Sequence, residues 1–549
     1  MAASERPGFA GAPVAPGLPG IWATALATSL VLGLLVVLLW IVFVNAFGWF
    51  WPADLWRLEL ADGRILVGAE AAQESTHDAA GERRERLQLK VGNRELTGAD
   101  FVWVERDQIV SRERPANLVR VVRAEYGDAF GRVVAATATD GTTLEDPTPA
   151  ALAAILAEGR TLRARRGSLH DEIASVRRPL TRAEEALDAV ERSSRAATEA
   201  AAAELDGLRH RVDSLWTALE PRLTELEGEL VELEARLAAG RLVLDAGSGR
   251  IETALGQVLE VLEPNRMGPL ARLGHALLAG VRFLFTEPRE ANTEGGIFPA
   301  LVGTVLMVLL MSLAVVPLGV ITAVYMTEYA REGLMLRLAT QAVNNLAGVP
   351  SIVFGMFGLA FFIYGVGGSL DRMFYADRLP TPTFGTGGIL WGALTLALLT
   401  VPVVIVATEE GLAAVPRIVR EGSLALGATK FETTYKVVLP AAAPGILTGM
   451  ILAMARAAGE VAPLMIVGME KLAPALPVDG QFPFVHLERK FMHLGFHIYD
   501  VGFQSPNVDA TKPLVFATAL LLIAVVTTMN LVAIGIRNHL RRKYAGSAV

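Results

Sequence analysis

The 549-residue sequence contains no cysteine, which excludes disulfide bonds and metal sites built on thiolates. It also contains no G-x(4)-G-K-[ST] phosphate loop, so the chain is not expected to hydrolyse ATP itself. Its eight histidines lack the spacing of a metal site, and its net charge of −7 gives no indication of a nucleic-acid partner. Apolar residues make up 52% of the chain, and their arrangement therefore indicates the structural class of the protein.

Long apolar runs predict a membrane protein. The mean hydropathy of +0.41 is too high for a soluble protein of this length. A spanning helix needs about 20 apolar residues, and several runs reach that length. They cover about residues 21–47, 297–326, 338–365, 387–407, 441–467 and 513–536. Another run, residues 272–285, is only about 14 residues long, which favours a helix lying in the membrane surface.

The charged stretch between the first two runs is predicted to be a soluble insert. Residues 1–20, before the first run, are rich in Pro, Gly and Ala and are expected to be disordered. Residues 52–148 contain short β-branched and aromatic runs separated by Gly-Asn, Asp-Gly and Gly-Asp pairs, which predicts a small β-rich domain. Residues 149–294 are predicted to be a helical, coiled-coil segment, with helix as far as about residue 262.

The helical prediction comes from leucine spacing. Apolar residues recur every three or four positions from Leu205 to Leu237, and the stretch before them has the same rhythm. The simplest arrangement is an antiparallel helical hairpin. Pro179 and Pro221 are expected to kink or restart its helices, because proline removes a helical hydrogen bond.

Basic residues predict the orientation in the membrane. They follow the fourth and sixth apolar runs, and such residues favour the cytoplasmic side. Six spans then place both termini in the cytoplasm and the insert outside the cell membrane. The residues concerned are Arg417, Arg420, Lys430, Lys436, Arg537, Arg541, Arg542 and Lys543.

A polar, helix-forming stretch at residues 408–440 lies between the fourth and fifth runs. Gly427 permits a sharp turn, Glu421 is a candidate polar anchor for that turn, and the next helix is expected to begin at Leu439-Pro440. The stretch resembles the cytoplasmic EAA loop of ABC-transporter permeases, with Gly422 and Ser423 in place of two alanines. The resemblance implies a helix, a turn and a second helix that contact a separate ATPase through a small apolar face. The residues assigned to this coupling are Glu421, Gly422, Ser423, Ala425, Leu426, Gly427, Ala428, Phe431, Leu439 and Pro440.

Four further motifs accompany this loop, and the ordered set resembles the PstA-type permeases of phosphate ABC importers, in a long form. They are GGIFPALVGTVLM at 295–307, PLGVITAVYMTEYA at 317–330, AGVPSIVFG at 347–355 and MARAAGEVAPL at 454–464. The resemblance implies an all-α polytopic protein whose six-span type I (MetI-like) permease core occupies residues 295–549 together with the first span, 21–47. It also implies a transport subunit rather than an enzyme, located in the bacterial inner membrane.

The same resemblance implies partners. They are a homologous PstC-type permease, a PstB-type ATPase dimer, a PstS-type phosphate-binding protein, phosphate itself and membrane lipid. No cofactor is expected on this chain, because ATP would act on the partner ATPase. Two alternatives remain open. One is a permease of the same class for molybdate, sulfate or phosphonate, and the other is a membrane signalling or interaction protein that reports phosphate status.

Arg456 and Glu460 are the candidate substrate-path residues. They are four positions apart in the fifth run, so a helix would place them on one face. Charges within a span are rare and normally face protein or a watery path, and a guanidinium suits a phosphate oxyanion. The alternative is a purely structural pair. Gly348 and Pro350 are expected to loosen the helix of the third run, either as a packing kink or beside a cavity.

Overall fold

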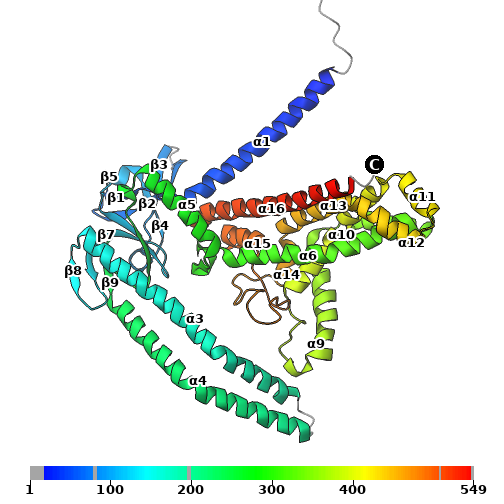
Figure 1. Ribbon diagram of the computed structural model, residues 1–549. Coiled ribbons are helices and arrows are strands. Elements are labelled where there is room, and N and C mark those ends of the chain that lie inside the picture. The colour runs from blue at the N-terminus through cyan, green and yellow to red at the C-terminus, as the bar shows by residue number, and fades with distance from the viewer. Residues whose placement is uncertain (1–17, 78–82, 194–198, 506–507, 546–549) are drawn as a thin grey trace, which may run out of the picture.

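The computed structural model describes residues 18–77, 83–193, 199–505 and 508–545 (Figure 1). Residues 1–17, which were predicted to be disordered, lie outside these ranges. Leu18 to Gly20 were also predicted to be disordered, but they form the first turn of helix α1 (Leu18–Phe50).

Within the described residues, six helical segments are long and apolar enough to cross a membrane. This confirms the predicted fold class, an all-α polytopic core with a soluble insert between its first two spans. π-helical turns extend or join several of these segments. The spanning elements are α1, α6 (Phe298–Val324), α8 (Ser351–Phe357) with α9 (Gly368–Phe374), α10 (Ile389–Ala413), α12 (Lys430–Thr433) with α13 (Leu439–Gly459), and α16 (Val508–Ala545).

Helix α10 is the centre of the membrane core. It packs against α6 and α13, and most of its apolar window is buried within the protein. The core around it contains Met311, Trp391, Leu396 and Leu464. By contrast, α1 contacts α16 and is buried only toward its C-terminal end, at Val42 and Ala46, and the rest of its apolar surface is exposed (Figure 1).

The insert contains two antiparallel sheets. The first has the strand order β4-β3-β2-β1-β5, and the second has the order β10-β9-β7-β6-β11, with β8 paired to β7. The alternating runs predicted as strands before residue 138 are strands. The first sheet consists of β1 (Leu55–Leu60), β2 (Ile65–His77), β3 (Arg83–Lys90), β4 (Phe101–Glu105) and β5 (Ile109–Glu113). The second consists of β6 (Leu118–Arg123), β7 (Ala129–Thr137), β8 (Thr143–Glu145), β9 (Arg241–Asp245), β10 (Arg250–Ala254) and β11 (Val258–Leu262).

The second sheet corrects the helical prediction. Residues 241–262 were expected to be helical, but they form β9, β10 and β11, which pair with β7, β9 and β6 respectively. The physical reason is a change of period, because RLVLD and RIETA alternate buried and exposed positions every second residue. The sheet is therefore built from segments on both sides of the helical arms.

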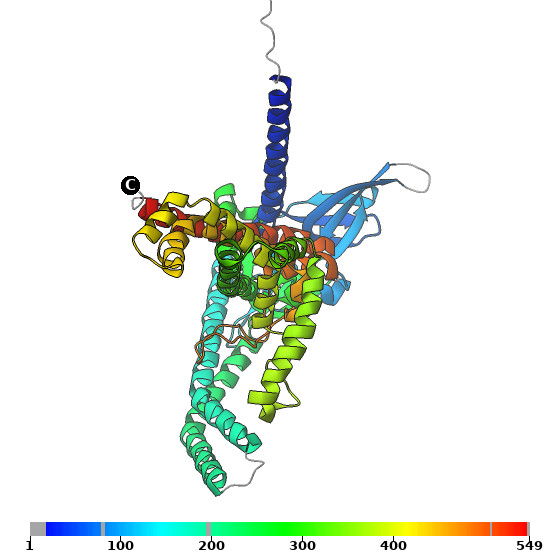
Figure 2. The ribbon, with the colours of Figure 1, turned by 90° about the vertical axis from the view of Figure 1, so that its right-hand side faces the viewer.

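Helices α3 (Pro149–Ser193) and α4 (Glu199–Ala239) form the predicted antiparallel hairpin. Leu180, Leu226 and Leu237 are buried where the arms pack, and ion pairs such as Arg165–Glu229 at 2.8 Å join them. The predicted restarts are wrong, since α3 continues through Pro179 and α4 continues through the proline at position 221. The hairpin extends from the sheets in the same direction as α9 (Figure 2), and α3 contacts the turn Ala376–Arg378 after α9.

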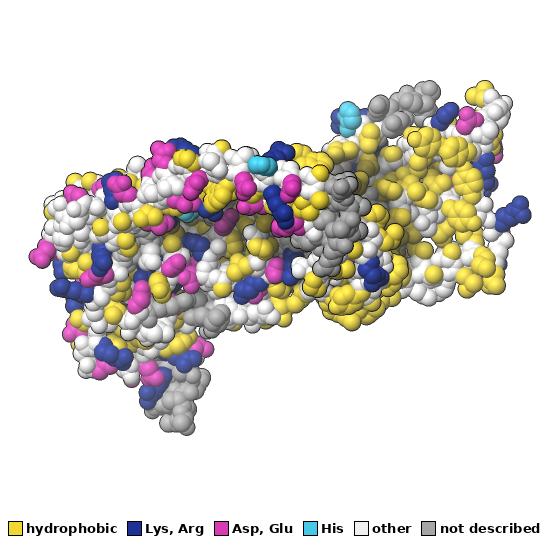
Figure 3. Space-filling view, turned by 90° about the horizontal axis from the view of Figure 1, so that it is seen from below, with side chains coloured by type: hydrophobic (Ala, Val, Ile, Leu, Met, Phe, Trp, Pro, Cys, Tyr) yellow, Lys and Arg dark blue, Asp and Glu magenta, His cyan; other side chains and the backbone are white. Residues whose placement is uncertain are grey.

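The two parts of the chain differ in the side chains that they expose. Seen from below, hydrophobic side chains gather over the spanning part on the right, and charged side chains spread over the insert on the left (Figure 3). The helix α5 (Pro269–Phe285) and the short pair β12 (Pro288–Arg289) and β13 (Glu294–Gly295) join the two parts.

The third apolar run is not one helix. It was predicted to span residues 338–365, but α7 (Leu334–Leu346) ends before Gly348, and the spanning segment starts at Ser351 and continues to Phe374. Pro350 cannot donate a helical hydrogen bond and disfavours helical geometry at the residue before it, so the expected loosening is a complete break. The other short helices are α2 (Arg94–Thr97), α11 (Arg417–Ala425), α14 (Ala462–Val467) and α15 (Leu494–Tyr499).

Candidate functional site

The coupling stretch forms a helix, a sharp turn and a second helix. Helix α11 ends at Ala425, and Gly427 follows with φ of +86°. Glycine adopts this left-handed conformation without the steric cost of a side chain. Thr429 then begins α12 with a capping box, in which its hydroxyl accepts a hydrogen bond from the Glu432 backbone N–H and the Glu432 carboxylate accepts one from the Thr429 backbone N–H.

Apolar side chains of this loop project into solvent. Leu426 is 91% exposed and Phe431 is 67% exposed, and the Phe431 ring stacks on that of Tyr435 at 6.0 Å. Ala425 is also exposed, and Ala428 is half-buried. Large apolar side chains are therefore exposed on a turn between two short helices, where they gain little from contacts within this chain.

Arg420 fastens the loop to the membrane bundle. Its guanidinium donates a 2.6 Å hydrogen bond to the carbonyl of Leu412 and lies 3.2 Å from the Glu328 carboxylate at the end of the α6 segment. Within the loop, the hydroxyls of Ser423 and Thr433 are 2.9 Å apart and join the two helices. Sequence reasoning missed this role of Arg420, although Glu328 lies within one of the motifs it used.

The structure does not give Glu421 the anchoring role expected of it. Glu421 is exposed, and within the described part of the chain its side chain forms no hydrogen bond or ion pair. Of these two adjacent residues, it is Arg420 that contacts the bundle. Glu421 and Gly422 remain on the outer surface of the loop.

The second helix of the loop and the fifth span form one helical segment. The predicted second helix, α12, begins at Lys430, residues Thr434–Val438 form a π-helical turn, and α13 begins at the predicted Leu439-Pro440. Pro440 lacks an N–H, and its ring would meet the carbonyl one turn earlier, so the preceding turn widens. One continuous helical segment therefore connects Lys430 in the loop to Gly459 in the membrane.

Arg456 and Glu460 lie together at the far end of that segment. The Arg456 Nε atom is 3.7 Å from the Glu460 carboxylate, and both side chains keep some exposure. Sequence reasoning placed both on one continuous helix, but α13 ends at Gly459 and Glu460 has an extended backbone with ψ of 127°. The pair therefore sits where the helix breaks, and its groups can separate without unwinding a regular turn.

Close backbone packing holds the break in place. Helix α14 follows it and packs against α8, where a Cβ added to Gly355 would lie 2.8 Å from the Cα of Pro463. A Cβ on Gly358 would likewise lie 2.3 Å from the Thr395 hydroxyl of α10. Pro463 is the sequence signal that could have predicted the break, since proline disfavours a helix running through it.

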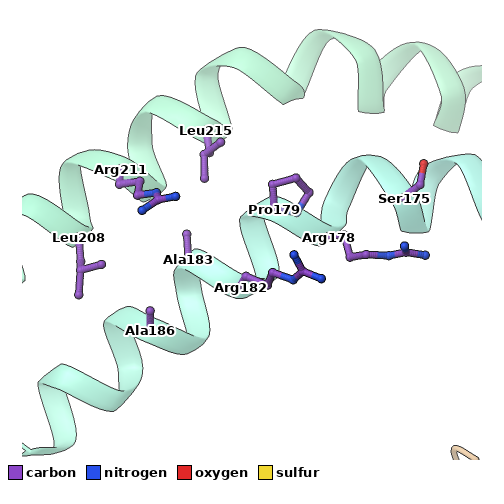
Figure 4. A pocket seen from close by; sticks show the side chains of 9 residues that line it. All are labelled: Ser175, Arg178, Pro179, Arg182, Ala183, Ala186, Leu208, Arg211 and Leu215. Carbon is purple, nitrogen blue, oxygen red and sulfur yellow. The ribbon is translucent and has the colours of Figure 1, made fainter. Parts of the chain in front are cut away.

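A cavity lies in the insert, between the arms of the hairpin. It has a volume of about 460 Å³ and opens beside Pro179 (Figure 4). Arg178 and Arg182 on α3 and Arg211 on α4 border it, and within the described ranges none of the three forms an ion pair with a carboxylate. The cleft is positively charged but belongs to the insert, so it is separate from the Arg456–Glu460 pair.

The broken fifth span and the exposed loop both lie in the part of the chain that one family model matches. The family described as "Binding-protein-dependent transport system inner membrane component" matches residues 315–546. The matched range covers less than half of the chain, and it contains the exposed loop and the Arg456–Glu460 pair.

Several relatives are phosphate permeases by name. The chain is 40% identical over 173 residues to "Phosphate transport system permease protein PstA 1" of Mycobacterium tuberculosis (strain ATCC 25618 / H37Rv), which covers 32% of this chain and 50% of that protein. It is 35% identical over 190 residues to PstA of Yersinia pestis, covering 34% and 58%. It is 32% identical over 195 residues to "Probable ABC transporter permease protein YqgH" of Bacillus subtilis, covering 35% and 59%. The chain thus spans only about half to three fifths of the length of these relatives.

Solved structures give more distant matches. A chain of the inward-facing MetNI methionine ABC transporter is 17% identical, with a TM-score of 0.33, over 44% of this chain and 94% of that one. A chain of a bacterial alginate ABC transporter is 14% identical, with a TM-score of 0.32, over 48% and 82%.

Proposed function

We propose that this chain is the transmembrane permease subunit of an ATP-driven, binding-protein-dependent importer of inorganic phosphate. The observation that carries the proposal is the exposed loop around Leu426 and Phe431, fixed to the bundle by Arg420 within a matched permease domain. The substrate is inferred from the relatives named as phosphate permeases.

The partners follow from this proposal. A PstB-type ATPase dimer binds the coupling loop, a homologous PstC-type permease completes the channel, and a PstS-type protein delivers phosphate from outside. The chain itself holds no cofactor, and ATP acts on the ATPase. The assembly lies in a bacterial cytoplasmic membrane, with the termini and the coupling loop inside and the insert outside, as the basic residues after the fourth and sixth spans favour.

The proposed mechanism uses the continuous helical segment from Lys430 to Gly459. Closure of the ATPases moves the loop, and the segment carries that movement to the Arg456–Glu460 pair at its other end. Arg456 then exchanges its contact with Glu460 for a charge-assisted hydrogen bond to the phosphate oxyanion. Glu460, at the end of the helix, repels the anion and favours its release when the pair forms again.

Labelled-phosphate uptake by phosphate-starved cells tests the proposal. Cells lacking the chain receive the intact chain, Gly427→Glu or Leu426→Glu, with Leu144→Glu in the insert as a matched surface control. High-affinity uptake should require the chain, fail in both loop variants and persist in the control. Excess molybdate or sulfate should leave it unchanged. Suppression by either anion would indicate another oxyanion substrate within the same architecture.

A deletion separates transport from a signalling or interaction role. The arms α3 and α4 leave and re-enter the second sheet near β8 and β9, so residues 149–239 can be replaced by a short Gly/Ser linker. A permease should retain phosphate uptake without the hairpin. Loss of a phosphate-dependent response, with uptake intact, would instead assign the signalling role to the insert.

A further inference from the structure

Helix α5 has two faces of opposite character. Six apolar side chains with helical spacing project from one face, and each is at least 40% exposed. They are Leu270, Leu273, Leu277, Leu278, Val281 and Phe285, which we call the α5 stripe. The helix contains no acidic residue, and its three basic residues lie off the stripe. An unpartnered apolar stripe of this length is costly in water.

The opposite face is fixed to the insert. Arg272 pairs with the Asp54 carboxylate and donates a 2.8 Å hydrogen bond to the carbonyl of Pro264. The Glu260 carboxylate on β11 accepts a 3.0 Å hydrogen bond from the Arg282 guanidinium and lies 3.5 Å from the His275 ring. Because both arginines of α5 are paired with carboxylates of the insert, the stripe is the side left for another contact.

The end of α5 lies where two spanning helices end. The Phe283 ring contacts that of Phe50, the last residue of α1, at 5.5 Å between ring centroids. The Phe283 carbonyl accepts a 2.9 Å hydrogen bond from the Ile297 backbone N–H, directly before α6. Figure 1 shows α5 beside the foot of α1, between the sheets and the bundle. Trp49 and Trp51 flank this level, and tryptophan is enriched where spanning helices leave the apolar core of a bilayer.

We propose that the α5 stripe lies in the bilayer, in the leaflet on the side of the insert, and that α5 holds the insert in one orientation on the membrane surface. The bilayer is the occupant that the position favours, because the stripe is continuous with spanning helices that lipid must already surround. Amphipathic helices with basic and apolar faces bind membrane interfaces in this way. The inference concerns membrane contact and does not depend on the transported substrate.

The absence of native cysteine allows a direct test in the full-length protein. Single variants Leu277→Cys and Val281→Cys would be spin-labelled and reconstituted in vesicles of phosphatidylcholine and phosphatidylglycerol. Collision with oxygen, which dissolves in lipid, would be compared with collision with a water-soluble nickel chelate. Leu309→Cys on α6 serves as the membrane control, and Gln108→Cys on the insert serves as the water control.

For labels on the α5 stripe, the ratio of oxygen to nickel collisions should be severalfold higher than for the label at position 108. It should approach the ratio for the label at position 309. A ratio equal to that at 108 would overturn the proposal, because the stripe would then face water. Labels immobilised and reached by neither agent would also overturn it, because a protein partner would then cover the stripe.

Discussion

The Arg420 guanidinium lies 3.2 Å from the Glu328 carboxylate and also donates a hydrogen bond to the Leu412 carbonyl. One side chain of the coupling helix α11 is thereby attached to the ends of two spans, α6 and α10. Both charged side chains are mostly buried, so solvent screens this pair less than the surface pairs of the hairpin. The coupling loop is therefore a rigid attachment rather than a free linker.

Glu328→Gln should weaken this attachment. Losing one partner of a mostly buried ion pair costs about 1–3 kcal/mol. This loss would weaken the attachment of the loop to the bundle. We expect phosphate uptake and co-purification of the ATPase to fall several-fold while the amount of chain in the membrane stays near normal. Glu332→Gln, at an exposed carboxylate in the same region, is the matched control. Additive effects of Glu328→Gln and Arg420→Gln would contradict a direct pair.

Gly427 should be replaceable only by residues that tolerate a positive φ. Its φ is +86°, and an added Cβ would meet no atom within 4 Å, so backbone strain alone decides the outcome. We expect activity to decrease in the order Gly, Asn, Ala, Val, since the left-handed conformation costs about 1–2 kcal/mol for an ordinary side chain and more for a β-branched one. ATPase binding to membranes carrying each variant measures this order. A fully active Val variant would show that position 427 does not require a positive φ.

Much of this loop was predictable from the sequence because local chemistry determines it. A glycine between two short helix-forming segments, followed by Thr429 and Glu432 at capping-box spacing, specifies the turn with little help from the rest of the fold. The anchor was not predictable in the same way. Arg420 and Glu421 are adjacent charged residues, and only the packing of α11 on the bundle decides which of them meets Glu328.

The larger errors arose where distant segments decide the local structure. Residues 241–262 follow a long leucine repeat, and they become strands because β6 and β7, over a hundred residues earlier, offer edges for pairing. The break at Glu460 differs from this case, because Pro463 is a local signal for it in the sequence. Apolar length alone gave the number of spans correctly, but it could not show where α7 separates from α8.

Arg456 and Glu460 should respond differently to neutralisation if they line the phosphate path. Arg456→Gln should raise the KM for uptake about 10- to 100-fold through the loss of a charge-assisted hydrogen bond to the anion, without lowering the level of the protein. Glu460→Gln should mainly lower the maximal rate, because it removes the group that displaces phosphate. If the pair is only structural, both variants should lower the amount of folded protein and leave KM unchanged, and the double variant should restore that amount.

His493 and His497 should make the α15 region sensitive to acid. Both are buried, and burial lowers the pKa of each from the usual 6.5 to about 4. In the unfolded chain these histidines take up protons near pH 6.5, while the folded chain excludes them until about pH 4. Stability is therefore complete above pH 6.5 and falls as the pH decreases from about 6.5 to about 4.

The loss over this window is roughly 3 kcal/mol for each histidine, and thermal unfolding of the purified protein between pH 7.5 and pH 4.5 measures it. His493→Asn should reduce the acid sensitivity and keep the fold, because the asparagine oxygen can still accept the hydrogen bond that the His493 Nδ1 atom accepts from the Gly495 backbone N–H. His210→Asn, at an exposed position on α4, should leave the pH profile unchanged. An acid sensitivity equal in all three proteins would show that the His493 ring is not its source.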